Sequence, residues 1–275
     1  MFSTALCAID GSESSLAAVR DAGELVGAQG RLTLLLATAY RHEGQARSPA
    51  IDPSEGSRII ARAREAAAED AVASDVVVEP GRAPAELVLE RSAGFDLLAI
   101  GSPLHSSWLG ALFMGAVAAS VERRLPVPLL AAPAEHSRPL LAEPRRLLVA
   151  SDGLEDSDEL VAFARRLADE HGFAATLLHV LGGEPRSHPH RVERQGLELA
   201  PQEGPRVEVG NPRELVVEVA RELDASIVLA GSRRTHGIAA VGSVSRRIAA
   251  HAPCPVLLIP PELLHADAGT LAAGC

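Results

Sequence analysis

The sequence predicts an α/β protein built from two doubly wound halves, each with a five-stranded parallel sheet and helices on both faces. Two observations support this prediction. Short apolar runs alternate with helical patterns along the chain, and the motifs of the first half recur in the same order in the second. Alternating strand and helix patterns favour parallel sheets whose strands are buried on both faces.

Three pairs of segments define the internal repeat. Residues 4–11 match 145–153, residues 95–102 match 225–232, and residues 125–130 match 252–257. The separation falls from 142 residues (Asp10 to Asp152) to 127 (Leu125 to Ala252), so the second copy is shorter. We therefore predict two homologous domains, 1–135 and 143–275, joined by a proline-rich polar linker.

The predicted strands follow from the apolar runs. They cover residues 5–9, 32–37, 76–78, 97–100 and 127–131, and then 147–150, 175–180, 207–209, 227–230 and 256–259. Leu16, Val19 and Val26 share one helical face in the segment between the first two strands. After the second strand, the first half carries a helical run at 57–73. The second half has only the Gly-, Pro- and His-containing segment 181–205, so we expect a reduced or missing helix there.

Composition excludes several classes of protein. The chain has 275 residues, 47% apolar and 3% aromatic, with a net charge of −10, which argues against a nucleic-acid partner. All 26 basic residues are Arg, which excludes a lysine P-loop and a Schiff-base lysine. No signal peptide and no membrane span is expected, so we predict a cytoplasmic protein without a membrane partner. Cys7, Cys254 and Cys275 are widely spaced, and neither a disulfide framework nor a zinc ribbon is expected.

Three polar or glycine motifs of each half are expected to meet where the strand order reverses. An Asp-Gly pair follows the first strand, a Gly-Ser pair ends the fourth, and a further glycine opens the next helix. A glycine loop before a helix N-terminus suits a phosphate, because its N–H groups and the helix dipole favour an anion. The aspartate suits a ribose hydroxyl, an adenine amine or a bridging metal ion.

Together these motifs resemble those of a tandem universal stress protein. The resemblance rests on residues 8–12, 81–84, 101–102 and 126–128 in the first half. In the second half it rests on 150–153, 177–180, 210–212, 231–232, 242–244 and 251–259. It implies two flavodoxin-like or Rossmann-like domains that pair through their last strands as a pseudo-two-fold pair. It also implies a stress-response role exerted by adenine-nucleotide binding, with ATP the expected ligand, alone or with Mg²⁺ or Mn²⁺.

The glycine loops depart from the pattern of the family's ATP-binding members, which is G-x-x-G, nine residues, then G-[ST]. The first half has Leu104 at the second glycine and Ala116 at the hydroxyl position. The second half has Arg234 at the second glycine but keeps Ser243, and Arg233 adds a second cation for phosphate oxygens. We therefore expect the nucleotide mainly in the second half.

The resemblance then implies two sets of ligand-contacting residues. The stronger set is Ala150, Asp152, Val180, Ala230, Gly231, Ser232, Arg233, Arg234, Gly242, Ser243 and Val244. The weaker set, in the first half, is Ala8, Asp10, Gly101, Ser102 and Gly115. No residue is assigned as a catalytic group or as a metal ligand.

Several alternatives stay open from the sequence alone. Each Asp before Gly can cap the next helix, and each strand-end glycine can serve only a tight turn. His188 and His190, with His179 upstream, suggest a metal, but a solvated loop is the preferred interpretation. At the level of function, the alternatives are a protein-interaction module without nucleotide and a slow metal-dependent ATPase. The protein partner and the formation of a homodimer are not determined by the sequence.

Overall fold

The structure is a computed structural model. It describes residues 1–38, 40–43, 46–49, 51–80, 84–102, 125–136, 138–153, 157–181, 189–199, 204–231, 243–260 and 263. The structural statements below concern these residues.

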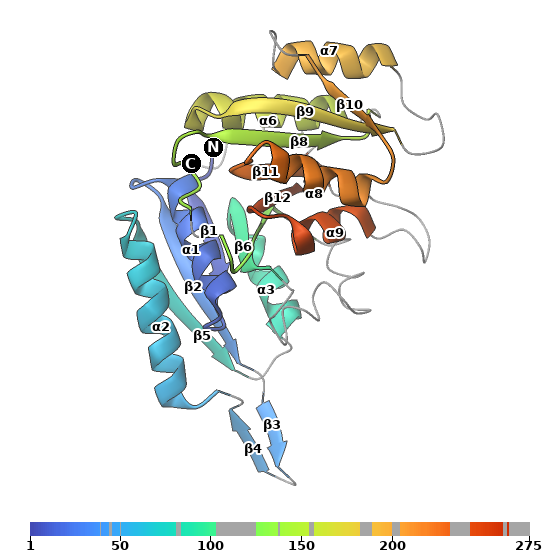
Figure 1. Ribbon diagram of the computed structural model, residues 1–275. Coiled ribbons are helices and arrows are strands. Elements are labelled where there is room, and N and C mark those ends of the chain that lie inside the picture. Colours follow the sequence, from blue (N-terminus) through green and yellow to red (C-terminus); the bar gives the residue numbers. More distant parts are fainter. Residues whose placement is uncertain are drawn as a thin grey trace.

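One ten-stranded sheet runs through both halves (Figure 1). The first half supplies β1 (Thr4–Ala8), β2 (Arg31–Thr38), β5 (Ala73–Pro80), β6 (Leu97–Gly101) and β7 (Leu129–Ala132). The second supplies β8 (Arg146–Ser151), β9 (Ala174–Leu181), β10 (Arg206–Val209), β11 (Ile227–Gly231) and β12 (Val256–Ile259). The order is β10-β9-β8-β11-β12-β7-β6-β1-β2-β5, and the strands within each half are parallel. The predicted fold class is confirmed.

The two halves join through their last strands. β7 and β12 pair in antiparallel orientation, with Leu130 opposite Leu257. This is the pairing that the family resemblance implies. The proline pairs at 126–128 and 253–255 lie just before these strands. Because each half covers one edge of the other, neither last strand is left as an exposed edge for association with other chains.

Helices cover both faces of the sheet and enclose two cores. On one face lie α1 (Glu13–Val26), α2 (Pro53–Ala68), α6 (Ser157–His171) and α7 (Pro189–Leu199). On the other lie α3 (Pro84–Ser92), α8 (Pro212–Glu222) and α9 (Ser243–His251). Successive strand residues alternate between the cores, as Cys7 and Ala8 do. Burial of Cys7 and Cys254 raises the pKa of each thiol to about 12, so both are inert apolar side chains.

The segment between the second and third strands differs most from prediction. Helix α2 begins at Pro53 because Asp52 caps it, accepting from the Ser54 amide, so the helix lies a few residues before the predicted 57–73. An unpredicted hairpin of β3 (Tyr40–Glu43) and β4 (Ala46–Pro49) precedes it and projects from the body in Figure 1. The second half has the shorter α7 at this place, 11 residues against 16, which confirms the expected reduction.

The solvated-loop interpretation of the histidine motif is wrong for His190. Pro189 opens α7 and His190 follows within its first turn, because proline is tolerated at the first helical position. His179 lies on β9 and is only 3% exposed. Residue 188 lies outside the described residues.

Candidate functional site

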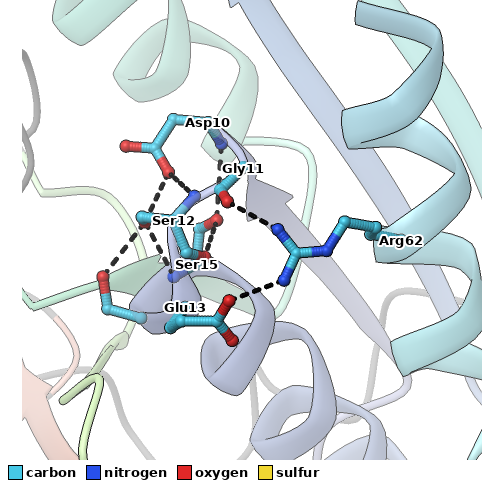
Figure 2. Close-up of polar contacts among 7 residues, drawn as sticks. Asp10, Gly11, Ser12, Glu13, Ser15 and Arg62 are labelled. Atoms are coloured by element: carbon cyan, nitrogen blue, oxygen red, sulfur yellow. Dashed lines mark hydrogen bonds and ion pairs between the residues drawn. The ribbon is translucent and has the colours of Figure 1, made fainter. Parts of the chain in front are cut away.

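In the first half the predicted aspartate lies in the turn between β1 and α1 (Figure 2). The Asp10 Oδ1 atom accepts hydrogen bonds from the Ser12 amide at 3.0 Å and from the Ser12 hydroxyl at 2.5 Å. Gly11 has a φ of +83°, a conformation that favours glycine. Ser12, not Asp10, is the N-cap of α1 and accepts from the Ser15 amide. The helix-capping interpretation of Asp10 is therefore wrong: its carboxylate orders the turn.

A residue that sequence analysis missed holds the same turn from α2. Arg62 donates from Nη1 to the Gly11 carbonyl at 3.1 Å and from Nη2 to Glu13 Oε1 at 2.6 Å (Figure 2). The guanidinium thus bridges the turn and the first residue of α1. Nothing in the sequence pattern marks Arg62, because it lies about fifty residues from the turn.

In the first half, the strand-end residues Gly101 and Ser102 both make packing contacts. A Cβ atom on Gly101 would lie 2.7 Å from the Ser15 amide nitrogen and 2.5 Å from Ser14 Oγ, so only glycine lets β6 approach α1 this closely. Gly101 has no positive φ, so its glycine is needed for this close approach and not for a left-handed backbone conformation. Ser102, 4% exposed, donates its hydroxyl hydrogen to the Ala249 carbonyl of α9 at 3.0 Å. This hydrogen bond joins the two halves.

The corresponding turn of the second half has a similar construction. Gly153 has a φ of +70°, and its amide donates to Ser151 Oγ at 3.1 Å. Asp152 Oδ1 accepts from the Ser157 hydroxyl at 2.8 Å. Ser157 stands five residues after Asp152, as Ser15 stands five after Asp10, and the Asp10 amide donates to Ser15 Oγ at 3.4 Å. The Asp and the Ser five residues later are therefore in contact in both halves, through the Asp152 carboxylate in the second half and the Asp10 amide in the first.

The apolar residues predicted for the second site share one face of the sheet. Ala150 pairs with Ala230 across β8 and β11 and lies against the core that α8 and α9 cover. Val180, near the end of β9, and Val244, in the first turn of α9, are also partly buried against this core. In the first half, Ala8 occupies the matching position beside Ile100. The strands thus bring these residues to one end of the sheet.

The strand-end glycines differ between the halves. Gly101 is buried, whereas Gly231 is partly exposed and its carbonyl accepts from the Ser245 hydroxyl at 3.2 Å. Ser243 is the first residue of α9. Ser232, Arg233, Arg234, Gly242 and Gly115 lie outside the described residues.

Comparison with known proteins identifies the family. The profile of the universal stress protein family matches residues 1–133 and 192–260. The chain belongs to this family. A universal stress protein of Thermus aquaticus is 29% identical over 137 residues, which cover 42% of this chain and 98% of that protein.

Solved structures support the fold along nearly the whole length. A universal stress protein from Archaeoglobus fulgidus superposes with a TM-score of 0.69 at 17% identity, covering 95% of this chain and 99% of that one. A Pseudomonas aeruginosa protein of unknown function superposes with a TM-score of 0.65 at 17% identity, covering 96% and 94%. At these identities the likeness establishes the fold of this universal stress protein and nothing more specific.

A second polar feature of this universal stress protein lies behind the Asp152 turn, on the α6 and α7 side. His179 Nδ1 lies 3.1 Å from the Ser151 carbonyl, and burial lowers the pKa of the imidazole. Gln195 of α7, fully buried, donates to Asp158 Oδ1 at 2.6 Å and accepts from Ser151 Oγ at 3.5 Å. Sequence analysis missed Gln195, because it expected a reduced or missing helix over residues 181–205, and the start of α7 is known only from the structure.

The described residues lack two features. They contain no cluster of three or more His, Cys, Asp or Glu side chains suited to a metal ion. Within the same residues, no helix has the length and apolarity to cross a membrane.

Proposed function

We propose that this universal stress protein acts by binding an adenine nucleotide, ATP, without turning it over. The principal site is at the end of β8 and β11 in the second half. The observation that supports this choice is the difference between the strand-end glycines. Gly101 is covered by α1, whereas the equivalent Gly231 is partly exposed beside the Asp152 turn.

The residues at this end of the second half suit the parts of a nucleotide. Ala150 and Val180 offer an apolar wall for adenine, and the Asp152 carboxylate offers acceptor oxygens for ribose hydroxyls. Helix α9 has no acidic residue in its first turn, so no side chain there offsets the positive end of its dipole. In this proposal the phosphates lie at this N-terminus, beside Ser243 and the preceding Gly242. The sequence supplies Arg233 and Arg234, which lie outside the described residues, as candidate countercharges.

Binding rather than turnover is proposed because no residue is assigned as a general base. The Asp152 carboxylate already accepts a hydrogen bond from Ser157, which suits a fixed acceptor better than a proton-transfer group. A divalent ion, Mg²⁺ or Mn²⁺, accompanies the phosphates in this proposal. Cytoplasmic location and an unidentified protein partner stay predictions.

The test is calorimetric titration of nucleotide-stripped protein with ATP, with and without Mg²⁺ or Mn²⁺, beside Asp152→Ala and Asp10→Ala. At 100 times the dissociation constant, bound ATP stabilises the protein by about 2.7 kcal/mol. We expect Asp152→Ala to abolish binding and Asp10→Ala to retain it. Absence of binding by the wild type at millimolar ATP overturns the proposal and favours an interaction module. Metal-dependent phosphate release that Asp152→Ala abolishes favours a slow ATPase.

A further inference from the structure

One buried layer of side chains is apolar in the first half and polar in the second. Equivalent positions in the two halves are matched in three ways. Residues at the end of β1 and β8 are 142 positions apart in the sequence, and residues on β2 and β9 are matched by the strand register beside β1 and β8. Residues on α2 and α7 are matched by counting six residues from the proline that opens each helix. The equivalent pairs are Ile9 and Ser151, Leu36 and His179, and Ile59 and Gln195. The three first-half residues belong to one hydrophobic core and are at most 7% exposed.

The three polar residues are as deeply buried as their apolar counterparts. Ser151, His179 and Gln195 are 8%, 3% and 0% exposed. Their contacts form a chain from α7 through Gln195 to Ser151, which stands directly before Asp152. Gln195 also bonds Asp158, which follows the Ser157 that donates to Asp152. The layer therefore contacts the Asp152 turn from both of its ends.

This polar layer is costly for folding alone. Buried polar groups cost free energy unless every group is paired, and His179 Nε2 has no partner within the described residues. The first half shows that the fold accepts an apolar layer at the same place. A role beyond packing explains why the second half carries the polar one at the proposed nucleotide site.

We infer that His179 and Gln195 are positioning residues that fix the Asp152 turn for the nucleotide, so that docking of α7 and nucleotide binding are coupled. The inference rests on the proposed function of the second half. By reciprocity, whatever strengthens one of these two equilibria strengthens the other by the same factor. Leu36 and Ile59 give the first half no such coupling.

The first experiment replaces the imidazole in two ways and measures ATP affinity and the unfolding midpoint together. His179→Leu copies the first half and removes the donor to the Ser151 carbonyl. His179→Asn keeps an N–H at the position of Nδ1. We expect His179→Leu to weaken ATP binding at least tenfold without lowering the unfolding midpoint, and His179→Asn to restore affinity to within threefold of wild type. Leu36→Ala, at the position of β2 equivalent to His179, is the matched control, expected to lower stability but not affinity.

The second experiment uses only the wild-type chain and does not depend on any variant folding. Hydrogen exchange of the α7 amides, residues 189–199, is measured with and without saturating ATP. ATP is expected to slow exchange in α7 at least threefold more than in α2. Equal protection of α7 with and without ATP overturns the coupling, as does wild-type affinity in His179→Leu. If the wild type binds ATP, either of these results refutes only the coupling and leaves the proposed function in place. A wild type that binds no ATP refutes the proposed function as well.

Discussion

Replacing Gly101 by Ala tests whether the glycine at the end of β6 serves packing. The added methyl carbon would lie 2.7 Å from the Ser15 amide nitrogen and 2.8 Å from the Ser14 carbonyl carbon. Both are backbone atoms in the first turn of α1, and they cannot rotate away as the end of a side chain can. The strand and the helix must therefore separate, and the buried residues between them lose contact.

The expected cost is that of overpacking a well-packed core, about 1–3 kcal/mol. A loss of about 2 kcal/mol lowers the midpoint of thermal unfolding by roughly 4–8 °C in a chain of this size. Gly94→Ala is the matched control, because a Cβ there meets only the Arg91 carbonyl oxygen, at 3.9 Å. Alanine at that turn is expected to be neutral or to stabilise by about 0.4–1 kcal/mol through the unfolded state. Urea denaturation and calorimetry of the two variants give the comparison.

Equal stability of Gly101→Ala and wild type would refute the packing argument. It would show that α1 and β6 are not in close contact, and it would return Gly101 to the set of residues available to a ligand. A large loss of stability in Gly94→Ala would instead show that any added methyl group perturbs the chain. The pair of variants therefore separates a local steric effect from a general sensitivity.

Three further outcomes follow from polar groups that are buried or partly buried. Burial and the nearby Glu24 raise the pKa of the Asp70 carboxyl to about 6. The stability that the protonated carboxyl contributes to the folded protein is therefore fully present at pH values below the ordinary pKa of aspartate, and it is lost as the pH rises through 6. Between pH 4 and 7.5 the unfolding midpoint should fall less in Asp70→Asn than in the wild type. Identical pH profiles of the two proteins would contradict this prediction. Ser102→Ala leaves the Ala249 carbonyl without its donor and should lower the free energy of unfolding by about 1 kcal/mol, measured by urea denaturation. An unchanged urea midpoint would contradict this prediction. Glu24→Ala leaves the linker amides of residues 140 and 141 without their acceptor and should cost about 1–3 kcal/mol. Limited proteolysis should then cut the linker faster, and an unchanged rate contradicts that contact.

The sheet was predictable because parallel strands that are buried on both faces appear as apolar runs. Each of the ten predicted strands overlaps an observed one, and the main error is the short prediction for β5. That strand lies at the edge of the sheet, where Ser74 is partly exposed and Asp75 is exposed, and these two polar residues interrupt the apolar pattern. The β3–β4 hairpin escaped prediction for the same reason, since its segments are short and polar.

The turns of the site were predictable, but the contacts that hold them were not. Asp10 and Asp152 stand beside glycines at strand ends, a pattern that sequence alone reveals. Arg62 and Gln195 come from helices more than forty residues away, and no spacing rule connects a helix face to a distant turn. Their identification needed the register of each helix against the sheet, which only the structure supplies.

Joining two copies in one sheet lets the same structural position take different roles. Ser102 ends the fourth strand of the first half, and its hydroxyl bonds the carbonyl of Ala249 in α9. The proposed phosphate site lies at the other end of that helix, at Ser243. A serine at a potential ligand site of one half thus supports the helix that serves the site of the other. The Ser102 hydroxyl is thus used for packing between the halves, whereas Gly101 packs against α1 of its own half.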